Sequence, residues 1–456
     1  MRWRRGSRPI WRRWDMGDNW FRTTLGSIAT KDGYGLVDGP FGSNLPASYY
    51  TDSGVPVIRG SNLSRGVVRF KADNFVFVSK ETAQKLKRSL CKANDIVFTK
   101  KGSLGQTGLV PEDGPFEVYL LSSNQMKLTV DDSLADPKFV YYVVSSDVSV
   151  RKILQDADQT GVPKTNINYL KSFPINLPPL HYQHAIADVL GTLDEKIELN
   201  RQMNRTLEAM ARAIFKAWFV DFEPVKAKAG GATSFRGMPQ AIFDQLPHRF
   251  TDTELGRVPE GWGVKPIGDT LDVTMGQSPP SEYYNDQGEG LPFHQGVRDY
   301  GFRFPTHRVS CTLESRLADE GDVLISVRAP VGRINVANRR MVIGRGLAAA
   351  KHREGHSSYA LYLLKHLFAV EDAVGDGTIY KAITKNFLLG MPVVSPPKAI
   401  VAECEKLLKP LDSLVETNVE ATQTLAAIRD TLLPKLISGE LPVGPPERST
   451  AEAVCR

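Results

Sequence analysis

The stretch PINLPPLHYQHAIADVLGTLDEKIELNRQMNRTLEAMARAIFKAW at residues 174–218 decides the architecture of the chain. A second version, PVVSPPKAIVAECEKLLKPLDSLVETNVEATQTLAAIRDTLLPKL, stands at residues 392–436. The two align without a gap at an offset of 218 (392 minus 174), so that Leu193-Asp194 matches Leu411-Asp412. Such an internal repeat predicts one unit written twice, each copy running from a globular domain through a proline stop into a long helix.

Both stretches have the apolar spacing of a helix that pairs with another helix. From Ile186 to Trp218 and from Cys404 to Leu436, side chains recur at alternating steps of four and three residues, the spacing of a coiled-coil seam. The alternative is two amphipathic helices packed separately on their own domains, and the unbroken stripe favours mutual pairing. Asn200 and Asn418 are predicted to set its register. The predicted interface positions are Leu190, Leu193, Ile197, Asn200, Leu207, Ile214, Leu408, Leu411, Val415, Asn418, Leu425 and Leu432.

The globular parts are predicted to have a mixed α/β fold. Strand-like runs at residues 74–78, 95–99 and 322–327 lie between turns rich in Gly, Pro, Asn and Asp. The expected segments are an N-terminal extension (1–16), a first globular domain (17–178), a central helix (179–222), a linker (223–253), a second globular domain (254–396), a C-terminal helix (397–441) and a tail (442–456).

The net charge of +6 is mostly local. Residues 1–16 hold six arginines and one aspartate, a net of +5, which leaves about +1 for the other 440 residues. This extension could be a basic arm that touches phosphates, but we favour translation starting at Met16. A twin-arginine export signal is rejected, because no apolar stretch follows Arg12-Arg13. Bulk charge therefore does not argue for nucleic-acid binding.

Several function classes lack their sequence signals. No run reaches the roughly 18 apolar residues of a membrane span. Four scattered cysteines fit no zinc or redox spacing and indicate reduced thiols in the cytoplasm. We find no phosphate-binding loop, metalloprotease motif or dinucleotide fingerprint, and no Asn/Asp-Pro-Pro-aromatic tetrapeptide of amino-methyltransferases. A non-catalytic chain without a bound metal or cofactor is expected.

Polar glycine turns that follow strand-like runs in both halves are the best binding candidates. Residues 38–44, 57–62 and 98–106 have counterparts of similar character at 293–298 and 326–333. Arg and Lys side chains can recognise guanine, Asn and Gln can recognise adenine, and backbone amides can hold phosphates. The alternative for any single turn is an ordinary solvated turn. The DNA-binding candidates are Ser43, Asn44, Arg59, Asn62, Lys100, Lys101, Ser103, Gln106, Gln277, His294, Gln295, Arg298, Arg328 and Arg333.

Several motifs resemble those of type I restriction–modification specificity subunits. They are Asp38-Gly-Pro-Phe-Gly-Ser-Asn-Leu, Gly54-Val-Pro-Val-Ile-Arg, Leu177-Pro-Pro-Leu, Leu193-Asp-Glu-Lys-Ile-Glu-Leu-Asn, Trp218-Phe-Val-Asp-Phe-Glu-Pro-Val and the terminal Leu432-Leu-Pro-Lys-Leu-Ile-Ser-Gly-Glu-Leu. The resemblance covers residues 17–441. It implies two target recognition domains that each read half of a split double-stranded DNA site, held apart by two antiparallel helices.

The resemblance also implies partners. Two adenine methyltransferase subunits would grip the helices, and restriction subunits would join optionally; these partners would bring AdoMet, ATP and Mg. The C-terminal helix departs from the family pattern, because Arg429 occupies a seam position and the helix is acidic. Two other readings stay open, a stand-alone methyltransferase or nuclease and a silent specificity cassette. AdoMet binding by the isolated chain would favour the first, and the neighbouring genes would reveal the second.

Overall fold

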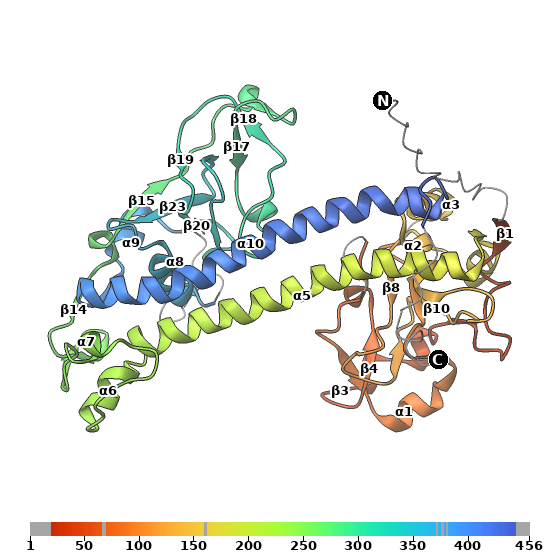
Figure 1. The fold of residues 1–456 in the computed structure, drawn as a ribbon, viewed down its shortest axis with the longest axis horizontal. Helices are drawn as coiled ribbons and strands as arrows, with labels where there is room; N and C mark the ends of the chain where they lie inside the picture. Colours follow the sequence, from red (N-terminus) through yellow and green to blue (C-terminus); the bar gives the residue numbers. More distant parts are fainter. Residues whose placement is uncertain are drawn as a thin grey trace, which may run out of the picture. The chain divides into compact units, whose positions relative to one another are not determined.

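The computed structural model describes residues 20–65, 70–158, 162–370 and 382–443, and the backbone of strands β24 (Ala373–Val374) and β25 (Thr378–Ile379). The predictions for the N-terminal extension and for most of the tail lie outside these residues. The chain divides into two compact units (Figure 1). Unit 1 combines Met1–Leu199 with Ala421–Arg456, and unit 2 is Asn200–Glu420.

Unit 1 contains two main sheets and a separate strand pair. The four-stranded sheet has the order β2 (Leu36–Asp38), β10 (Gln125–Leu128), β7 (Ile96–Thr99), β8 (Thr107–Leu109). The five-stranded sheet has the order β3 (Tyr50–Thr51), β5 (Val76–Val78), β4 (Val55–Ile58), β9 (Tyr119–Leu121), β6 (Leu90–Cys91), with β4 and β9 parallel. The separate pair is β1 (Phe21–Thr24) with β11 (Pro174–Leu177). The helices are α1 (Lys80–Lys85), α2 (Pro137–Ser145), α3 (Asp147–Asp156) and α4 (Ile167–Ser172).

Unit 2 has the same strand orders. Its four-stranded sheet runs β15 (Leu271–Met275), β23 (Leu347–His352), β20 (Val323–Ser326), β21 (Ile334–Val336). Its five-stranded sheet runs β16 (Tyr284–Asn285), β18 (Ser310–Cys311), β17 (Leu291–His294), β22 (Met341–Ile343), β19 (Leu317–Ala318), with β17 and β22 parallel. The equivalent separate pair is β14 (Gly263–Pro266) with β26 (Pro392–Ser395). Further elements are α6 (Glu223–Ala229), α7 (Gln240–Phe243), β12 (Phe250–Thr253), β13 (Gly256–Pro259), α8 (Ser357–Leu367) and α9 (Lys385–Gly390).

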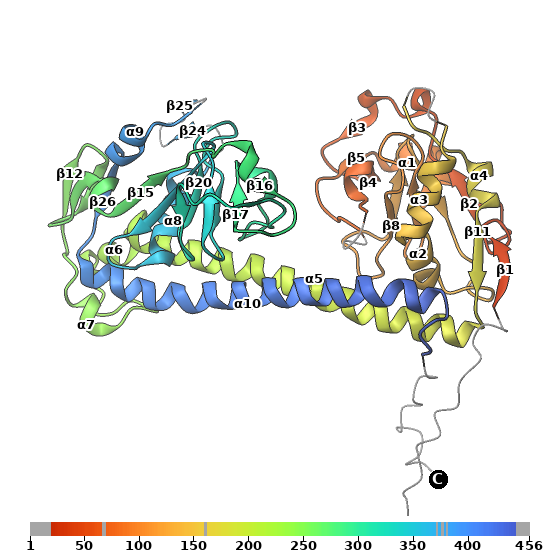
Figure 2. The same cartoon turned by 90° about the horizontal axis from the view of Figure 1, so that it is seen from above.

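In each unit, one helix packs on the four-stranded sheet close to the long helices. In unit 1 this is α2, which contacts β8, and in unit 2 it is α8, which contacts β20, β21 and β23 (Figure 2). The start of α2 follows from its sequence. Pro137 occupies the first turn, where a missing N–H costs nothing, and the Asp136 carboxylate accepts a hydrogen bond from the Phe139 amide at 2.7 Å.

Two helices of 40 residues each contribute to both units. They are α5 (Leu180–Phe219) and α10 (Lys398–Ile437), and each lies inside the range predicted for a long helix. In unit 1, Leu190 of α5 and Leu436 of α10 belong to one buried apolar cluster. In unit 2, the Asn418 side-chain amide donates to Asn204 Oδ1 at 3.0 Å. The helices therefore contact each other within each unit, and Asn418 has Asn204 as its partner.

The segment predicted as a linker, residues 223–253, is folded. Val225, Met238, Phe243 and Leu246 are all buried in the main apolar cluster of unit 2. The Gly, Pro and small residues of this segment predict a linker, but its widely spaced apolar side chains pack into the core of unit 2. The linker prediction is wrong in this respect.

The described residues contain no helix that is both long and apolar enough to cross a membrane. Cys91, Cys311 and Cys404 are free and buried, and Cys455 lies outside the described residues. Within the same ranges, no group of three or more His, Cys, Asp or Glu side chains is arranged to hold a metal ion.

Candidate nucleic-acid interface

In unit 1, four loops meet where β2, β4, β7 and β9 begin or end. The Ser122 amide donates to the Ile58 carbonyl at 3.0 Å, and the Lys100 amide donates to the Asn124 carbonyl at 2.7 Å. The Gly39 amide donates to the Gln125 carbonyl at 2.8 Å. These bonds gather one surface, the unit 1 edge, which comprises residues 38–44, 59–62, 100–106 and 122–125.

Unit 2 builds the corresponding surface from the corresponding strands. The Gly344 amide donates to the His294 carbonyl at 2.8 Å, and the Val327 amide donates to the Gly346 carbonyl at 2.9 Å. The Gln277 amide joins them by donating to the Ile343 carbonyl at 3.0 Å. The unit 2 edge comprises residues 276–278, 294–298, 327–333 and 344–346.

A glycine allows the loops to touch at the same place in both edges. A Cβ atom on Gly39 would stand 1.9 Å from the Ser122 carbonyl oxygen, and one on Gly276 would stand 2.1 Å from the Gly344 carbonyl oxygen. Any side chain at these positions would push backbone apart. The sequence of each turn is therefore fitted to this convergence of loops.

The two edges differ in charge. The unit 2 edge contains four arginines and no carboxylate, and all four are exposed: Arg298, Arg328, Arg333 and Arg345. The unit 1 edge contains Arg59, Lys100 and Lys101 against Asp38, a net of +2. Lys100 Nζ lies 2.7 Å from Asp38 Oδ1, so part of this charge is neutralised locally. Both edges carry net positive charge and can therefore attract a polyanion, and the unit 2 edge carries more of it.

The structure brings most of the predicted DNA-binding residues to the two edges. Two of these 14 candidates are buried, and Arg59, Lys100 and Gln106 are half-buried. The exposed ones are Ser43, Asn44, Lys101, Ser103, Gln277, Gln295, Arg298, Arg328 and Arg333.

Asn62 is buried and holds its own loop, so its prediction as a base-reading residue is wrong. Its side-chain oxygen accepts from the Arg59 amide at 2.9 Å, and its side-chain nitrogen donates to the carbonyls of Lys71 and Asp73. The side chain is 0% exposed, which leaves no face for a base.

His294 is also unsuited to direct contact with DNA. It is 1% exposed, and its Nε2 lies 3.0 Å from His307 Nδ1, while His307 Nε2 lies 3.0 Å from Asn338 Oδ1. The Asn338 oxygen can only accept, so His307 carries its proton on Nε2 and His294 donates from Nε2. Burial, with repulsion from His307, lowers the pKa of His294 to about 4. The imidazole is a neutral structural group.

Two residues absent from the prediction belong to the edges. Gln125 is 1% exposed and lies with Gln106 beside Gly60, whose missing Cβ would be 3.9 Å from Gln125 Nε2. Arg345 follows β22, and its amide donates to Ser278 Oγ at 3.3 Å. The sequence Ile-Gly-Arg-Gly at residues 343–346 could have revealed Arg345, since it repeats the pattern of a basic residue in a glycine turn after a strand.

None of the predicted helix-interface side chains is fully exposed. Six are buried, namely Leu190, Ile197, Asn200, Leu207, Leu408 and Val415. Six are half-buried, namely Leu193, Ile214, Leu411, Asn418, Leu425 and Leu432.

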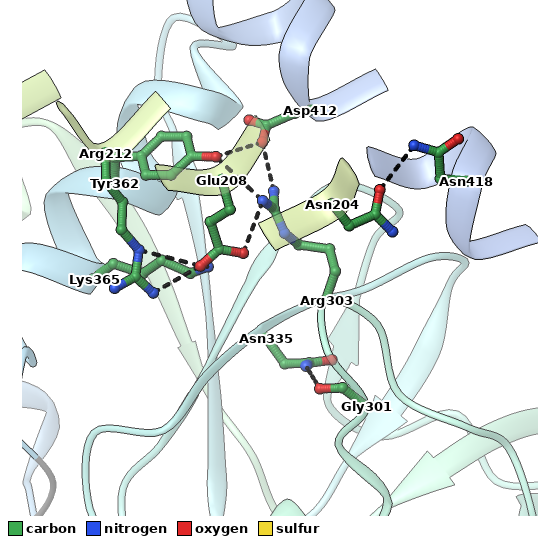
Figure 3. A network of polar contacts seen from close by, with 10 residues as sticks. All are labelled: Asn204, Glu208, Arg212, Gly301, Arg303, Asn335, Tyr362, Lys365, Asp412 and Asn418. Atoms are coloured by element: carbon green, nitrogen blue, oxygen red, sulfur yellow. Dashed lines mark hydrogen bonds and ion pairs between the residues drawn. The ribbon is translucent and has the colours of Figure 1, made fainter. Parts of the chain in front are cut away.

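A buried polar cluster joins the globular part of unit 2 to helices α5 and α10 (Figure 3). Arg303 donates to Asp412 Oδ1 at 2.6 Å and to Glu208 Oε2 at 3.3 Å. Tyr362 also donates to Asp412 Oδ1, at 2.7 Å. Lys365 Nζ donates to Glu208 Oε1 at 2.6 Å. Burial opposes ionisation of Glu208, but Lys365 and Arg303 outweigh it, so the pKa of Glu208 is lowered.

Unit 1 has a smaller cluster of the same kind. Tyr142 of α2 donates to Asp194 Oδ2 at 2.7 Å, and Arg429 of α10 donates to Asp194 Oδ1 at 2.9 Å. The side chains of Asp194 and Arg429 are each 6% exposed. Arg429, a charged residue at a position where the seam pattern predicts an apolar one, therefore has a buried carboxylate as its partner.

Comparison with known proteins identifies the class of the chain. The family model of the type I restriction modification DNA specificity domain matches residues 42–209. A Methanocaldococcus jannaschii protein described as the type I restriction enzyme MjaX specificity subunit is 30% identical over 359 residues, which cover 76% of this chain and 79% of that protein. The HindI specificity subunit of Haemophilus influenzae is 24% identical over 402 residues, 75% of this chain and 87% of that one.

A solved structure shares the fold. The crystal structure of the type I restriction–modification system S subunit from M. genitalium aligns with a TM-score of 0.55 at 16% identity, covering 93% of this chain and 97% of that one. The chain belongs to the family of type I restriction enzyme specificity subunits, which recognise the DNA target. The family expected from the sequence motifs is confirmed.

Proposed function

We propose that this specificity subunit reads a DNA site split into two parts, one part at the unit 1 edge and the other at the unit 2 edge. The observation that carries the proposal is the duplication of the edge. Both units have the same strand orders, and a glycine at the same place, Gly39 or Gly276, lets the loops converge. Two equivalent surfaces on one chain are what a bipartite site requires.

The chemistry of the edges fits this role. Exposed Arg298, Arg328 and Arg345 can donate to guanine or to phosphate, and exposed Gln277 and Gln295 can pair with adenine. Gln295 is already oriented, because its Oε1 accepts from Ser278 Oγ at 2.8 Å. A pre-oriented amide loses less conformational entropy when it binds a base.

In this proposal the chain is a non-catalytic subunit that positions methyltransferase subunits for adenine methylation, and optionally restriction subunits for cleavage. Two methyltransferase subunits would bind α5 and α10, whose outer faces keep large exposed apolar side chains. AdoMet, ATP and Mg are assigned to these partners and none to this chain. The exposed apolar residues are Val189, Leu199, Met203 and Met210 on α5 and Leu414 and Ile428 on α10.

We further propose that α5 and α10 pair along their whole length as an antiparallel coiled coil that sets the spacing of the two half-sites. A 40-residue helix is about 60 Å long. Two half-sites that lie one helical turn apart on the same side of DNA are separated by about 34 Å, centre to centre. The helices are therefore long enough for this task.

The test compares two arginines at opposite ends of β22. Arg345 follows the strand at the unit 2 edge, while Arg340 precedes it and pairs with Glu314 at 3.2 Å. Arg345→Ala in the complex with methyltransferase subunits is expected to weaken DNA binding about tenfold at fixed salt, the effect of losing one good contact. Arg340→Ala is the matched control and should bind as the unmodified protein does. Equal affinities for both variants would contradict the proposal.

A further inference from the structure

A short loop of unit 2, residues 299–308, folds back on itself directly after Arg298. The Thr306 amide donates to the Asp299 carbonyl at 2.8 Å, and Arg308 Nε donates to Asp299 Oδ1 at 2.5 Å. These bonds close the loop at its base. We call residues 299–308 the strap.

The strap is bound to the unit 2 edge at one end and to the long helices at its tip. At the edge, His307 contacts His294 at 3.0 Å between ring nitrogens. At the tip, Arg303 is 3% exposed and donates to Asp412 on α10 and to Glu208 on α5 (Figure 3). One loop thus spans from DNA-reading segments to both helices.

The strap also rests on the four-stranded sheet. The Asn335 side-chain amide of β21 donates to the Gly301 carbonyl at 3.2 Å, and the Val336 amide donates to the Arg303 carbonyl at 2.9 Å. The backbone on both sides of the tip is therefore fixed. A shift of Arg303 relative to the helices would move the base of the loop as well.

The charges at the tip require arginine. A planar guanidinium can reach two carboxylates and a hydroxyl at once, as Arg303 does with Asp412, Glu208 and Tyr362. Lys365 and Arg212 also contact Glu208, so this carboxylate keeps cationic partners when Arg303 is removed. An Arg303 variant therefore loses the link between strap and helices, and it leaves Asp412 with the Tyr362 hydroxyl but without its cation.

We propose that Arg303 is a positioning residue, which holds the unit 2 edge in place on α5 and α10 so that recognition of the second half-site depends on it. Arg303 itself is buried and does not touch DNA. The inference rests on the proposed function, because it assumes that the unit 2 edge reads one half-site.

The experiment uses the full chain assembled with its methyltransferase subunits. For each half-site, the discrimination ratio is the Kd for a duplex with that half scrambled divided by the Kd for the intact duplex. Arg303→Met should lower the discrimination ratio of the half-site read by unit 2 by at least about fivefold. This loss of affinity is at the low end of what one mismatched base pair typically causes in a specific site. The ratio for the other half-site should not change. A purely structural role would lower the folded fraction but leave both ratios unchanged.

Two variants keep the test decisive. Arg429→Met removes an equally buried arginine that lies on α10 rather than on a loop, and it should leave the ratio for the unit 2 half-site unchanged. Asp299→Asn removes the partly exposed ion pair at the base of the strap and leaves the backbone hydrogen bond between Thr306 and Asp299, so little stability is lost. It should lower the same ratio as Arg303→Met does, by a smaller factor. This variant replaces Arg303→Met if the latter does not fold.

Unchanged ratios in both strap variants, or an equal fall in the two ratios, would overturn the inference. An unmodified complex that discriminates neither half-site would instead overturn the proposed function, and the inference with it.

Discussion

The two units place the same pair of side chains at the same point of their long helices. In unit 1, Tyr142 of α2 donates to Asp194 of α5, and in unit 2, Tyr362 of α8 donates to Asp412 of α10. The two aspartates are 218 residues apart (412 minus 194), which is the offset that aligns the two long-helix sequences. Each buried carboxylate needs a cation, because an uncompensated buried charge is strongly unfavourable.

The source of that cation differs. In unit 1 it is Arg429 of the partner helix α10. The equivalent position in α5 is Ala211 (429 minus 218), which cannot supply a charge. In unit 2 the cation is Arg303, which comes from a loop of the globular part. An aspartate at this offset can therefore join helix to helix in one unit and helix to a loop of the globular part in the other.

Removing the two arginines should cost different amounts of stability, and this is the largest effect expected. Arg429→Met leaves the Asp194 side chain, which is 6% exposed, without its buried cation and should lower the free energy of unfolding of unit 1 by about 3–5 kcal/mol. Arg303→Met should cost less, because the Asp412 side chain is 16% exposed. Urea denaturation of both variants measures the difference. Equal losses would show that the two clusters are equivalent after all.

The paired amides of unit 2 give a smaller effect that depends on removing one partner or both. Asn418→Leu leaves Asn204, which is 4% exposed, without its 3.0 Å bond and should destabilise the protein by about 1–3 kcal/mol. Asn204→Leu combined with Asn418→Leu should recover that loss, since replacing both partners of a hydrogen bond by apolar groups is nearly neutral or stabilising. Thermal unfolding of the single and double variants decides between the outcomes. A double variant with lower thermal stability than the single variant would exclude a specific Asn204–Asn418 pair.

Periodicity in the sequence predicted the long helices, because a seam of apolar residues is a local signal with a fixed spacing. The same periodicity placed Arg429 in the seam but did not predict its partner. That partner is Asp194, which is more than 200 residues away in the chain. Likewise, the periodicity predicted polar residues at the seam but could not show that Asn204 is the partner of Asn418, because a repeating pattern does not fix which residues of the two helices meet.

Glycine turns predicted most of the two edges, since a backbone that must approach another backbone closely excludes side chains. They could not separate exposed from buried polar residues within a turn. Asn62 satisfies its own loop, whereas Asn44 is exposed, and both stand in similar Gly-Ser-Asn sequences. The difference arises from the segment around Lys71 and Asp73, which supplies carbonyls to Asn62 only.

Acid should weaken unit 2 more than the globular part of unit 1, and this is the smallest effect expected. Residues 20–178 contain no histidine, whereas burial lowers the pKa of both His294 and His352 in unit 2 to about 4. Unfolded histidines bind protons below about pH 6.5, so the stability contribution is complete above that pH and is lost as the pH falls toward 4. Hydrogen exchange at pH 7 and pH 5, corrected for intrinsic rates, reports each unit separately. Equal changes in both units would contradict the assignment to these histidines.

The most direct test of the central claim, that each unit reads its own half-site, is to exchange one globular part and map methylation. Residues 20–178 are replaced by the matching part of a relative with a different target, and the methylated motif is sequenced in cells that also contain the methyltransferase subunits. If each unit reads its own half-site, one half of the motif changes while the other half and the spacer stay the same. A motif that changes in both halves, or in neither, would contradict it.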